Sequence, residues 1–302
     1  MCCHTTESGK TRVSYIIATR NRADFLDRAL QNVRAFIAPE DELIVIDGMS
    51  TDHTAEVIKK HGDIISVFES SPDCGEAHAL NKGILKSRGE VIKFITDDDY
   101  FYPQAMNQAV SVMLSHANID ALQCGGVMYR IDPGTNAERL HTYFCKVGPA
   151  GQLPVAGVGL FLRRAAIPRV GLLDAQCRFP DTDYHSRLVS CGVNFKYLNV
   201  KLFRHTLRLH SGEYRFPGRN LAESVRAHLL ETMELPGGES LVFLMNFGLL
   251  LGRHTVGRWF IRLLAFIARP LQTLGLMFFK GRRRISGESN SLVEPVWDGS
   301  LS

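Results

Sequence analysis

Three consecutive aspartates, at residues 97–99, are the stretch of the sequence best suited to chemistry. They follow the largely apolar run Val91–Ile95 and precede the aromatic residues and proline at 100–103. Adjacent carboxylates repel one another, so a fold that ends a buried strand on them needs a cation there, most simply a hard divalent metal with oxygen ligands. A solvated acidic turn is the alternative, because Asp is a common turn former. The triplet alone does not decide between the two.

Hydrophobic patterning indicates which elements hold these aspartates. Short apolar runs alternate with amphipathic stretches through the first half of the chain, which is typical of β-α-β units around a mainly parallel sheet. The expected strands are residues 13–18, 43–46, 64–68 and 91–95, and the expected helices are residues 25–37, 54–60, 77–84 and 103–114. Further expected elements are strands at 121–128 and 158–162 and a helix at 181–191. Ligands of an open α/β sheet bind beyond the carboxyl ends of its strands, where the aspartates lie.

The composition is that of a globular protein with one large domain or a domain and an appendage. The chain has 302 residues, of which 45% are hydrophobic and 22% are charged. Its seven cysteines include no C-x-x-C pair, which argues against a disulfide framework and a structural zinc site and predicts reduced thiols in the cytoplasm. The first dozen residues show no secretory signal. No P-loop, G-x-G-x-x-G, H-E-x-x-H or G-x-S-x-G motif occurs.

Four other segments occur in order along the first half of the chain. They read IIATRNR at residues 16–22, VIDGMSTDHT at 45–54, SPDCG at 71–75 with ALNKGI at 79–84, and GEV at 89–91 leading into TDDD at 96–99. Together they resemble the family 2 glycosyltransferases, closely over residues 12–115 and more thinly to about residue 212. The resemblance implies the GT-A fold, a Rossmann-like, mainly parallel sheet flanked by helices. It also implies transfer of a sugar from a nucleotide diphosphate sugar to an acceptor hydroxyl, with inversion as in most of the family, in cell-surface polysaccharide or glycolipid synthesis.

The resemblance assigns the nucleotide-sugar contacts to the first half of the chain. The candidates are Thr19, Asn21, Arg22, Asp47, Asp73, Asn81, Lys82 and Asp97. Thr19, Asn21 and Arg22 correspond to the family's nucleotide-contact loop, and Asp47 to its nucleoside-binding aspartate. A lysine at position 82 suits the phosphates as a point charge, although an exposed helix face is an equally good interpretation. His78 stands where the family often has an acid.

The family pattern at the triplet is Asp-x-Asp or a variant ending in Asp-Asp. Thr96 occupies the place of the first acid of the fuller pattern, so the metal is expected at Asp98, with Asp99 or Asp97 assisting, and with the donor ribose as the alternative for Asp97. Mg²⁺ or Mn²⁺ fits oxygen ligands and a diphosphate, and would act as a Lewis acid for the leaving group. Two histidines are candidate additional ligands: His205 and His210.

Residues 179–188 resemble the family's Glu-Asp-x-x-Leu-x-x-Arg region, with Pro180 in place of the Glu. Aligned in this way, Asp181 is the candidate general base that takes the proton from the acceptor hydroxyl. Asp183 is the alternative. It lies four residues before Arg187, however, and that spacing also predicts an ion pair on a helix.

The C-terminal part of the chain is basic and apolar. Residues 240–287 contain eight Lys or Arg and no Asp or Glu. The apolar stretch at 240–252 is shorter than the roughly 20 residues of a membrane span. The arginines at 258, 262 and 269 fall on one helical stripe amid aromatic and aliphatic residues, which predicts peripheral contact with anionic lipid through residues 240–284 at the inner face of the cytoplasmic membrane. A helix packed on the catalytic domain is the alternative.

The expected organisation is therefore a GT-A domain, a helical extension and a disordered tail. The GT-A domain covers residues 12–219, divided into a nucleotide-sugar half (12–115) and an acceptor half (116–219); the extension covers 220–285 and the tail 286–302. A glycan or a lipid-linked glycan is the expected acceptor, and nucleic acid is not an expected partner because no binding motif occurs.

Two other functions are compatible with the sequence. A nucleotidyltransferase would share the α/β fold and the metal but needs a Gly-rich basic loop, and residues 18–22 contain no glycine. A non-catalytic, sugar-nucleotide-binding relative at the membrane is the second, because Thr96 and Pro180 depart from the family pattern.

Overall fold

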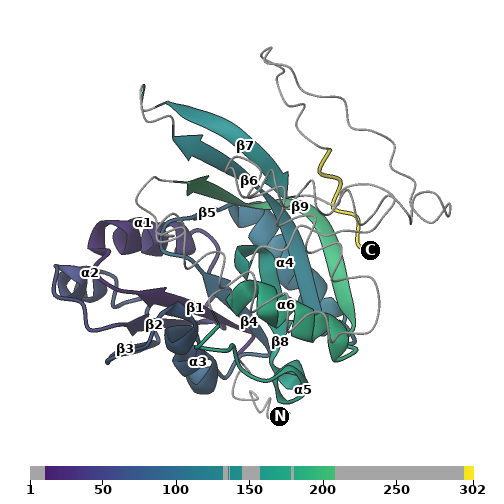
Figure 1. Ribbon diagram of the computed structural model, residues 1–302, viewed down its shortest axis with the longest axis horizontal. Coiled ribbons are helices and arrows are strands. Elements are labelled where there is room, and N and C mark those ends of the chain that lie inside the picture. The colour runs from purple at the N-terminus through teal and green to yellow at the C-terminus, as the bar shows by residue number, and fades with distance from the viewer. Residues whose placement is uncertain (1–10, 132–134, 136, 145–156, 178–179, 208–295) are drawn as a thin grey trace, which may run out of the picture. The chain divides into compact units, whose positions relative to one another are not determined.

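The computed structural model describes residues 11–131, 135, 137–144, 157–177, 180–207 and 296–302 (Figure 1). The chain divides into two compact units, residues 1–209 with 292–302 and residues 210–291. All described residues belong to the first unit. The predicted extension (220–285), its membrane contact (240–284) and His210 lie outside the described residues.

The described part of the chain forms one mixed sheet in the order β3-β2-β1-β4-β8-β6-β9-β5, with β7 paired to β6. The strands are β1 (Val13–Thr19), β2 (Glu42–Asp47), β3 (Val67–Ser70), β4 (Val91–Ile95), β5 (Tyr100–Phe101), β6 (Ala121–Ile131), β7 (Glu138–Phe144), β8 (Leu160–Arg163) and β9 (Phe195–Leu207). The first four strands are parallel, and β8 joins β4 in the antiparallel sense. The carboxyl ends of β1, β2 and β4 therefore meet at one edge of the sheet.

Helices cover both faces of this sheet. They are α1 (Ala23–Val33), α2 (Thr54–Lys60), α3 (Glu76–Lys86), α4 (Pro103–Ser115), α5 (Ile167–Val170) and α6 (Pro180–Ser190), with 3-10 turns η1 (Gly157–Gly159) and η2 (Arg164–Ala166). Residues of β1 alternate between two hydrophobic clusters, because successive side chains of a strand point to opposite faces. One cluster joins Tyr15 and Ile17 to α1 and α4, and the other joins Ile16 to α3 and α6.

The apolar spacing explains the helices, and their ends differ from the expectations. Leu26, Leu30 and Val33 recur at helical spacing and are buried on α1, which ends at Val33 rather than at residue 37. Pro103 occupies the first turn of α4, where its missing N–H has no partner to lose. No helix within the described ranges combines the length and the apolar character needed to cross a bilayer.

Residues 296–302 were expected to be disordered, and the structure shows otherwise. They run antiparallel to β9: Tyr197 N–H donates to Ser302 O (2.8 Å) and Asn199 N–H donates to Ser300 O (2.9 Å). The Asn199 side chain also donates to Asp298 Oδ1 (2.7 Å). Backbone groups on this edge of β9 need hydrogen-bond partners, and this segment supplies them. The prediction of disorder from residue 286 onward is therefore wrong for these seven residues.

Candidate active site

The loops that follow β1 and β2 are joined to each other through Asn21. Its backbone N–H donates to Ser50 Oγ (2.7 Å), and its side-chain Oδ1 accepts from Thr51 N–H (2.7 Å). Asn21 has a φ of 51°, in the left-handed region that Asn tolerates better than most residues. The next residues are joined as well, since Ala23 N–H donates to Asp52 Oδ2 (3.0 Å). The two loops thus form one continuous rim at the carboxyl edge of the sheet.

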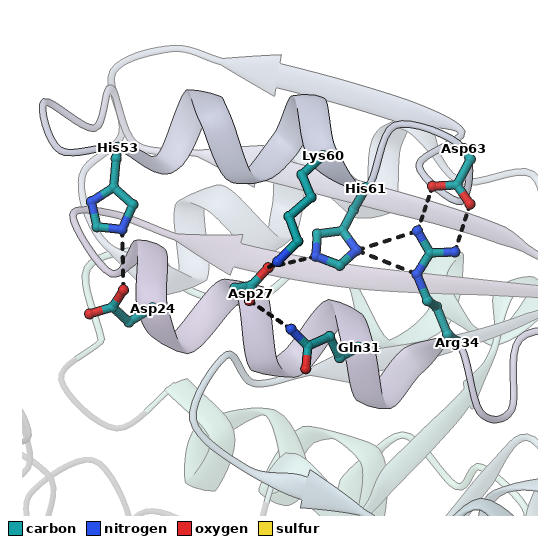
Figure 2. Close-up of polar contacts among 8 residues, drawn as sticks. All are labelled: Asp24, Asp27, Gln31, Arg34, His53, Lys60, His61 and Asp63. Atoms are coloured by element: carbon teal, nitrogen blue, oxygen red, sulfur yellow. Dashed lines mark hydrogen bonds and ion pairs between the residues drawn. The ribbon is translucent and has the colours of Figure 1, made fainter.

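Side-chain contacts extend this connection along α1 and α2 (Figure 2). The pairs are His53 with Asp24, Lys60 and His61 with Asp27, and Arg34 with His61 and Asp63. His61 is only 3% exposed, with Nε2 2.7 Å from Asp27. Because an arginine can only donate, Nδ1 accepts from Arg34 and Nε2 carries the proton donated to Asp27. The two helices behind the rim are thereby fixed to each other.

Asp97, the first aspartate of the triplet, is buried at the end of β4 and held by the β1 loop. Its Oδ2 accepts from Thr19 Oγ1 (3.0 Å), and its Oδ1 lies 3.2 Å from Arg22 Nε. The same guanidinium donates through Nη2 to Asp98 Oδ2 (2.6 Å) and stacks on the ring of Phe25. Burial raises the pKa of Asp97 to about 6, Arg22 opposes that shift, and Asp98 adds to it. Arg22 is therefore a cation in direct contact with both carboxylates.

Asp99, the last aspartate of the triplet, contacts a residue from the second half of the chain. Its Oδ1 lies 2.6 Å from His205 Nδ1, and its Oδ2 accepts from Thr96 Oγ1. The antiparallel pairing of Tyr100 with Arg204 between β5 and β9 places His205 at this point. One ligand atom from each of Asp98, Asp99 and His205 lies within 4.8 Å of the others. The two carboxylates suit Mn²⁺ or Mg²⁺, and the imidazole is a ligand more typical of transition metals, so the donor set fits Mn²⁺ better than Mg²⁺.

Asp47 and Asp73 lie at neighbouring positions of the rim. Asp47 is buried, and its carboxylate accepts from Ser50 Oγ (2.5 Å) and Ser70 Oγ (2.6 Å), so it holds its own loop in place. Asp73 packs against Gly48, where a Cβ would lie 2.4 Å from Asp73 Oδ2. A side chain at position 48 would therefore have to displace the Asp73 carboxylate.

The side chains of Lys82 and Asn81 form hydrogen bonds with other segments of the chain. Lys82 Nζ donates to Ser71 Oγ (2.8 Å) and Pro72 O (2.6 Å), which fixes the loop in front of Asp73. The Asn81 amide donates to Leu173 O (2.7 Å) and accepts from Leu173 N–H (2.9 Å). These contacts support a structural role for Asn81, and its contact with the nucleotide stays a prediction.

The two candidate bases differ in their surroundings. Asp183 Oδ2 lies 2.7 Å from Arg187 Nη2, and Arg187 also donates to Val170 O and Leu172 O. Asp183 is thus part of a structural ion pair. Asp181 is exposed in the first turn of α6, and the backbone of Gly157 lies against it, since a Cβ on Gly157 would come within 3.1 Å of Asp181 Cβ.

Glu76 is a site residue that the sequence did not single out. It begins α3 directly after Gly75, and part of its side chain reaches solvent. Desolvation raises the pKa of Glu76 to about 7, the charges of Asp181, Asp97 and Asp98 add to the shift, and Arg22 opposes it. Glu76 therefore lies within electrostatic reach of both the triplet and the candidate base. His78, at the position where the family often has an acid, accepts a hydrogen bond from Cys74 N–H (3.1 Å).

A family model described as Glycosyl transferase family 2 matches residues 14–166. An uncharacterized glycosyltransferase of Nostoc sp. is 29% identical over 126 residues, which are 40% of this chain and 37% of that protein. The succinoglycan biosynthesis protein ExoU of Rhizobium meliloti is 32% identical over 145 residues, which are 45% of this chain and 42% of ExoU. The matched part thus spans less than half the length of these two relatives.

Among solved structures, the S. aureus protein TarS (residues 1–349, in complex with UDP-GlcNAc) has a TM-score of 0.59 and 16% sequence identity. The match covers 76% of this chain and 68% of that one. At this identity the likeness concerns the fold, which is α/β and GT-A-like as the sequence predicted.

Proposed function

Because the chain belongs to glycosyl transferase family 2, we propose that it transfers a sugar from a nucleotide diphosphate sugar to a hydroxyl of a surface glycan. The observation that carries the proposal is the convergence of Asp97, Asp98, Asp99, Arg22 and His205 at the carboxyl edge of the sheet. The similarity to ExoU, named for succinoglycan biosynthesis, supports a polysaccharide product.

The donor is assigned to the rim formed by the β1 and β2 loops. Asp47 and Asp97 are the carboxylates available to the nucleoside, and Arg22 is the cation nearest to the expected diphosphate. TarS has the same fold and was solved with UDP-GlcNAc, so a UDP-sugar is the first donor to test. The charges of Asp97, Asp98 and Asp181 all act on Glu76. We assign to the Glu76 side chain a hydrogen bond with a hydroxyl of the donor sugar.

Asp98, Asp99 and His205 are the residues that would hold Mn²⁺ or Mg²⁺. When bound, the cation neutralises the diphosphate and stabilises the charge of the leaving group. Asp181 supplies the base: its carboxylate takes the proton of the acceptor hydroxyl as that oxygen bonds to the anomeric carbon, while the bond from this carbon to the diphosphate oxygen breaks. A single displacement of this kind inverts the anomeric centre.

Calorimetric titration tests the donor site. Purified protein is titrated with a panel of UDP- and GDP-sugars, once with Mn²⁺ and once with EDTA. Binding of one nucleotide sugar that weakens in EDTA is the expected result. If no nucleotide binds under either condition, the proposal is wrong.

Substitution of the candidate base tests the reaction. Asp181→Asn is expected to abolish transfer while nucleotide affinity stays within about twofold, because the amide keeps the shape but cannot accept the proton. Asp183→Asn is the matched comparison and is expected to lower stability through Arg187 and to retain turnover. Unchanged turnover in Asp181→Asn would assign the base elsewhere.

Location at a membrane is the remaining part of the proposal, and it rests on the sequence alone. The basic, apolar residues 240–284 would bring the site close to a lipid-linked acceptor at the cytoplasmic face of the membrane. Co-sedimentation with anionic vesicles is expected, and replacement of Arg282, Arg283 and Arg284 by Gln is expected to weaken it. Equal binding to neutral vesicles would contradict an electrostatic contact with lipid.

A further inference from the structure

Lys93 is a fully buried cation at the centre of the sheet. It lies in the middle of β4, between Tyr15 of β1 and Phe161 of β8, and none of its surface is exposed. Val91 and Ile95, two residues away on either side, belong to the hydrophobic cluster on the same face. An uncompensated charge in such a place costs several kcal/mol, so its partners determine what the lysine does.

The partners of Lys93 come from two segments near the candidate site. Its Nζ donates to the backbone carbonyl of Val158 and lies 5.0 Å from the ring centroids of both Phe101 and Phe161. Aromatic faces stabilise a cation, and Phe101 follows the aspartate triplet by two residues. Burial lowers the pKa of Lys93 to about 7, and the charges of Cys124 and Asp99 oppose that shift.

Val158 is the middle residue of the η1 turn. One end of this turn packs on β6, and the other lies against the first residues of α6. A Cβ on Gly159 would lie 2.4 Å from Cys124 O, so this end of the turn packs directly on β6. At the other end the Gly157 backbone abuts Asp181. A displacement of the η1 turn would therefore change the packing of Gly157 against Asp181, the candidate base.

We propose that Lys93 is a positioning residue for sugar transfer: its side chain fixes the η1 turn and thereby the place of Asp181 opposite the triplet. The inference rests on the proposed function, in which Asp181 is the base. Lys93 touches no reacting group. A purely apolar side chain would fill the same space but would leave Val158 O without its donor.

Lys93→Met tests this role, because methionine is similar in length and removes only the donor and the charge. The turnover number is expected to fall about 10- to 100-fold, since small misplacements of a catalytic group have effects of that size. The donor dissociation constant is expected to stay within about twofold, because the hydrogen bonds and ion pairs described for Thr19, Arg22 and Asp97 join them to one another and to Asp98, not to η1. Lys59→Met, an exposed lysine on α2, is the matched control and is expected to behave like the native protein.

Gly157→Ala tests the same turn from its other end. The added Cβ would lie 3.1 Å from Asp181 Cβ, so turnover is expected to fall while the core around Lys93 stays intact. The double variant Lys93→Met with Gly157→Ala is expected to lose less activity than the product of the two single losses, because both displace one turn. Multiplicative losses would overturn the proposal.

Four outcomes separate this inference from simpler explanations. Native turnover in folded Lys93→Met would make the lysine a core filler and overturn the proposal, as would equal losses of turnover and donor affinity. If Lys93→Met does not fold, Gly157→Ala decides, and native turnover in that variant overturns the proposal. Asp181→Asn is measured alongside: if it retains activity, the assignment of the base fails, and the role of Lys93 fails with it.

Discussion

At the scale of single residues, the site depends on one arginine among several carboxylates. Arg22 contacts Asp97 and Asp98, and its charge also acts on Glu76. Removing a cation from between buried or partly buried carboxylates leaves their repulsion uncompensated. Substitution of Arg22 or Glu76 is therefore expected to change the electrostatic balance of the site.

Arg22→Gln is expected to weaken nucleotide-sugar binding about tenfold or more, because the guanidinium contacts Asp97 and Asp98, where the diphosphate is proposed to bind. Calorimetric titration of the donor in Mn²⁺ measures the effect. Arg28→Gln is a matched control, since Arg28 stacks on the same Phe25 ring (4.8 Å) from an exposed position. Equal losses in the two variants would mean that the ring contact, rather than the aspartates, explains the effect.

The raised pKa of Glu76 predicts that the stability of the fold depends on pH. Its folded pKa of about 7 lies above its ordinary value of 4.5, so the protonated form stabilises the fold and that contribution is lost as pH rises through 7. The neutral variant Glu76→Gln has no such loss. Because the unfolded group begins to ionise at its ordinary pKa of 4.5, in EDTA the urea midpoints of the native protein and Glu76→Gln are expected to be similar at pH 4 and to differ at pH 8, with the native protein less stable. A pH-independent difference would contradict the coupling.

At the scale of elements, the loops of the site are fixed by the helices behind them. The α1–α2 contacts of Figure 2 join the segments that follow the two rim loops. They are not equivalent: the Asp24–His53 pair is exposed on both sides, whereas His61 is buried against Asp27. Exposed ion pairs contribute little to the free energy of unfolding, whereas a buried polar group that loses its hydrogen-bond partner lowers it substantially.

Asp27→Ala is therefore expected to lower the free energy of unfolding by about 1–3 kcal/mol, because buried His61 loses its acceptor. Asp24→Ala is expected to change it by less than about 0.5 kcal/mol. Urea denaturation of both variants measures the difference. Similar losses in the two variants would show that His61 finds another partner when Asp27 is removed.

The hydrophobic pattern along the sequence predicted the strands and helices that form from residues close together in the chain. The apolar runs that form β1, β2 and β4 were identified, and so was the collection of polar residues at their carboxyl ends. The strand expected at 64–68 lies instead at Val67–Ser70, because its register is set by pairing with Ile44–Asp47 of β2. The two-residue strand β5 carries too short a pattern to be recognised.

Contacts between distant segments could not be predicted in this way. The Asn81 amide pairs with Leu173, 92 residues away, and nothing in the local sequence of α3 indicates that partner. Lys93 is a second example, because a single lysine in an apolar strand gives no sign of the carbonyl of Val158, 65 residues later. The family resemblance named Asp98, Asp99 and His205, but only the β5–β9 pairing explains why they lie together.

At the scale of the whole molecule, the last described residues, 296–302, lie against β9 although they are far from it in the sequence. Residues 296–302 cover the edge of β9 beside Tyr197 and Asn199, and Gly299 packs close to Gln108 of α4. Ser300 N–H and Asn199 lower the pKa of Asp298 to about 2. Residues 296–302 are thereby attached to β9 and α4.

Removal of residues 296–302 is expected to expose the β9 edge without disturbing the active site. The backbone N–H groups of Tyr197 and Asn199 lose their acceptors, Ser302 O and Ser300 O, so their hydrogen exchange is expected to accelerate about tenfold or more. The N–H of Ile16, in the central strand β1, is the internal control and is expected to exchange at its native rate. Donor affinity is expected to be unchanged, because the hydrogen bonds described for this segment go to Tyr197 and Asn199 and not to Arg22 or the triplet. Unchanged exchange at Tyr197 would show that the segment does not hold this edge in solution, and weakened donor binding would show that the β9 edge supports the site.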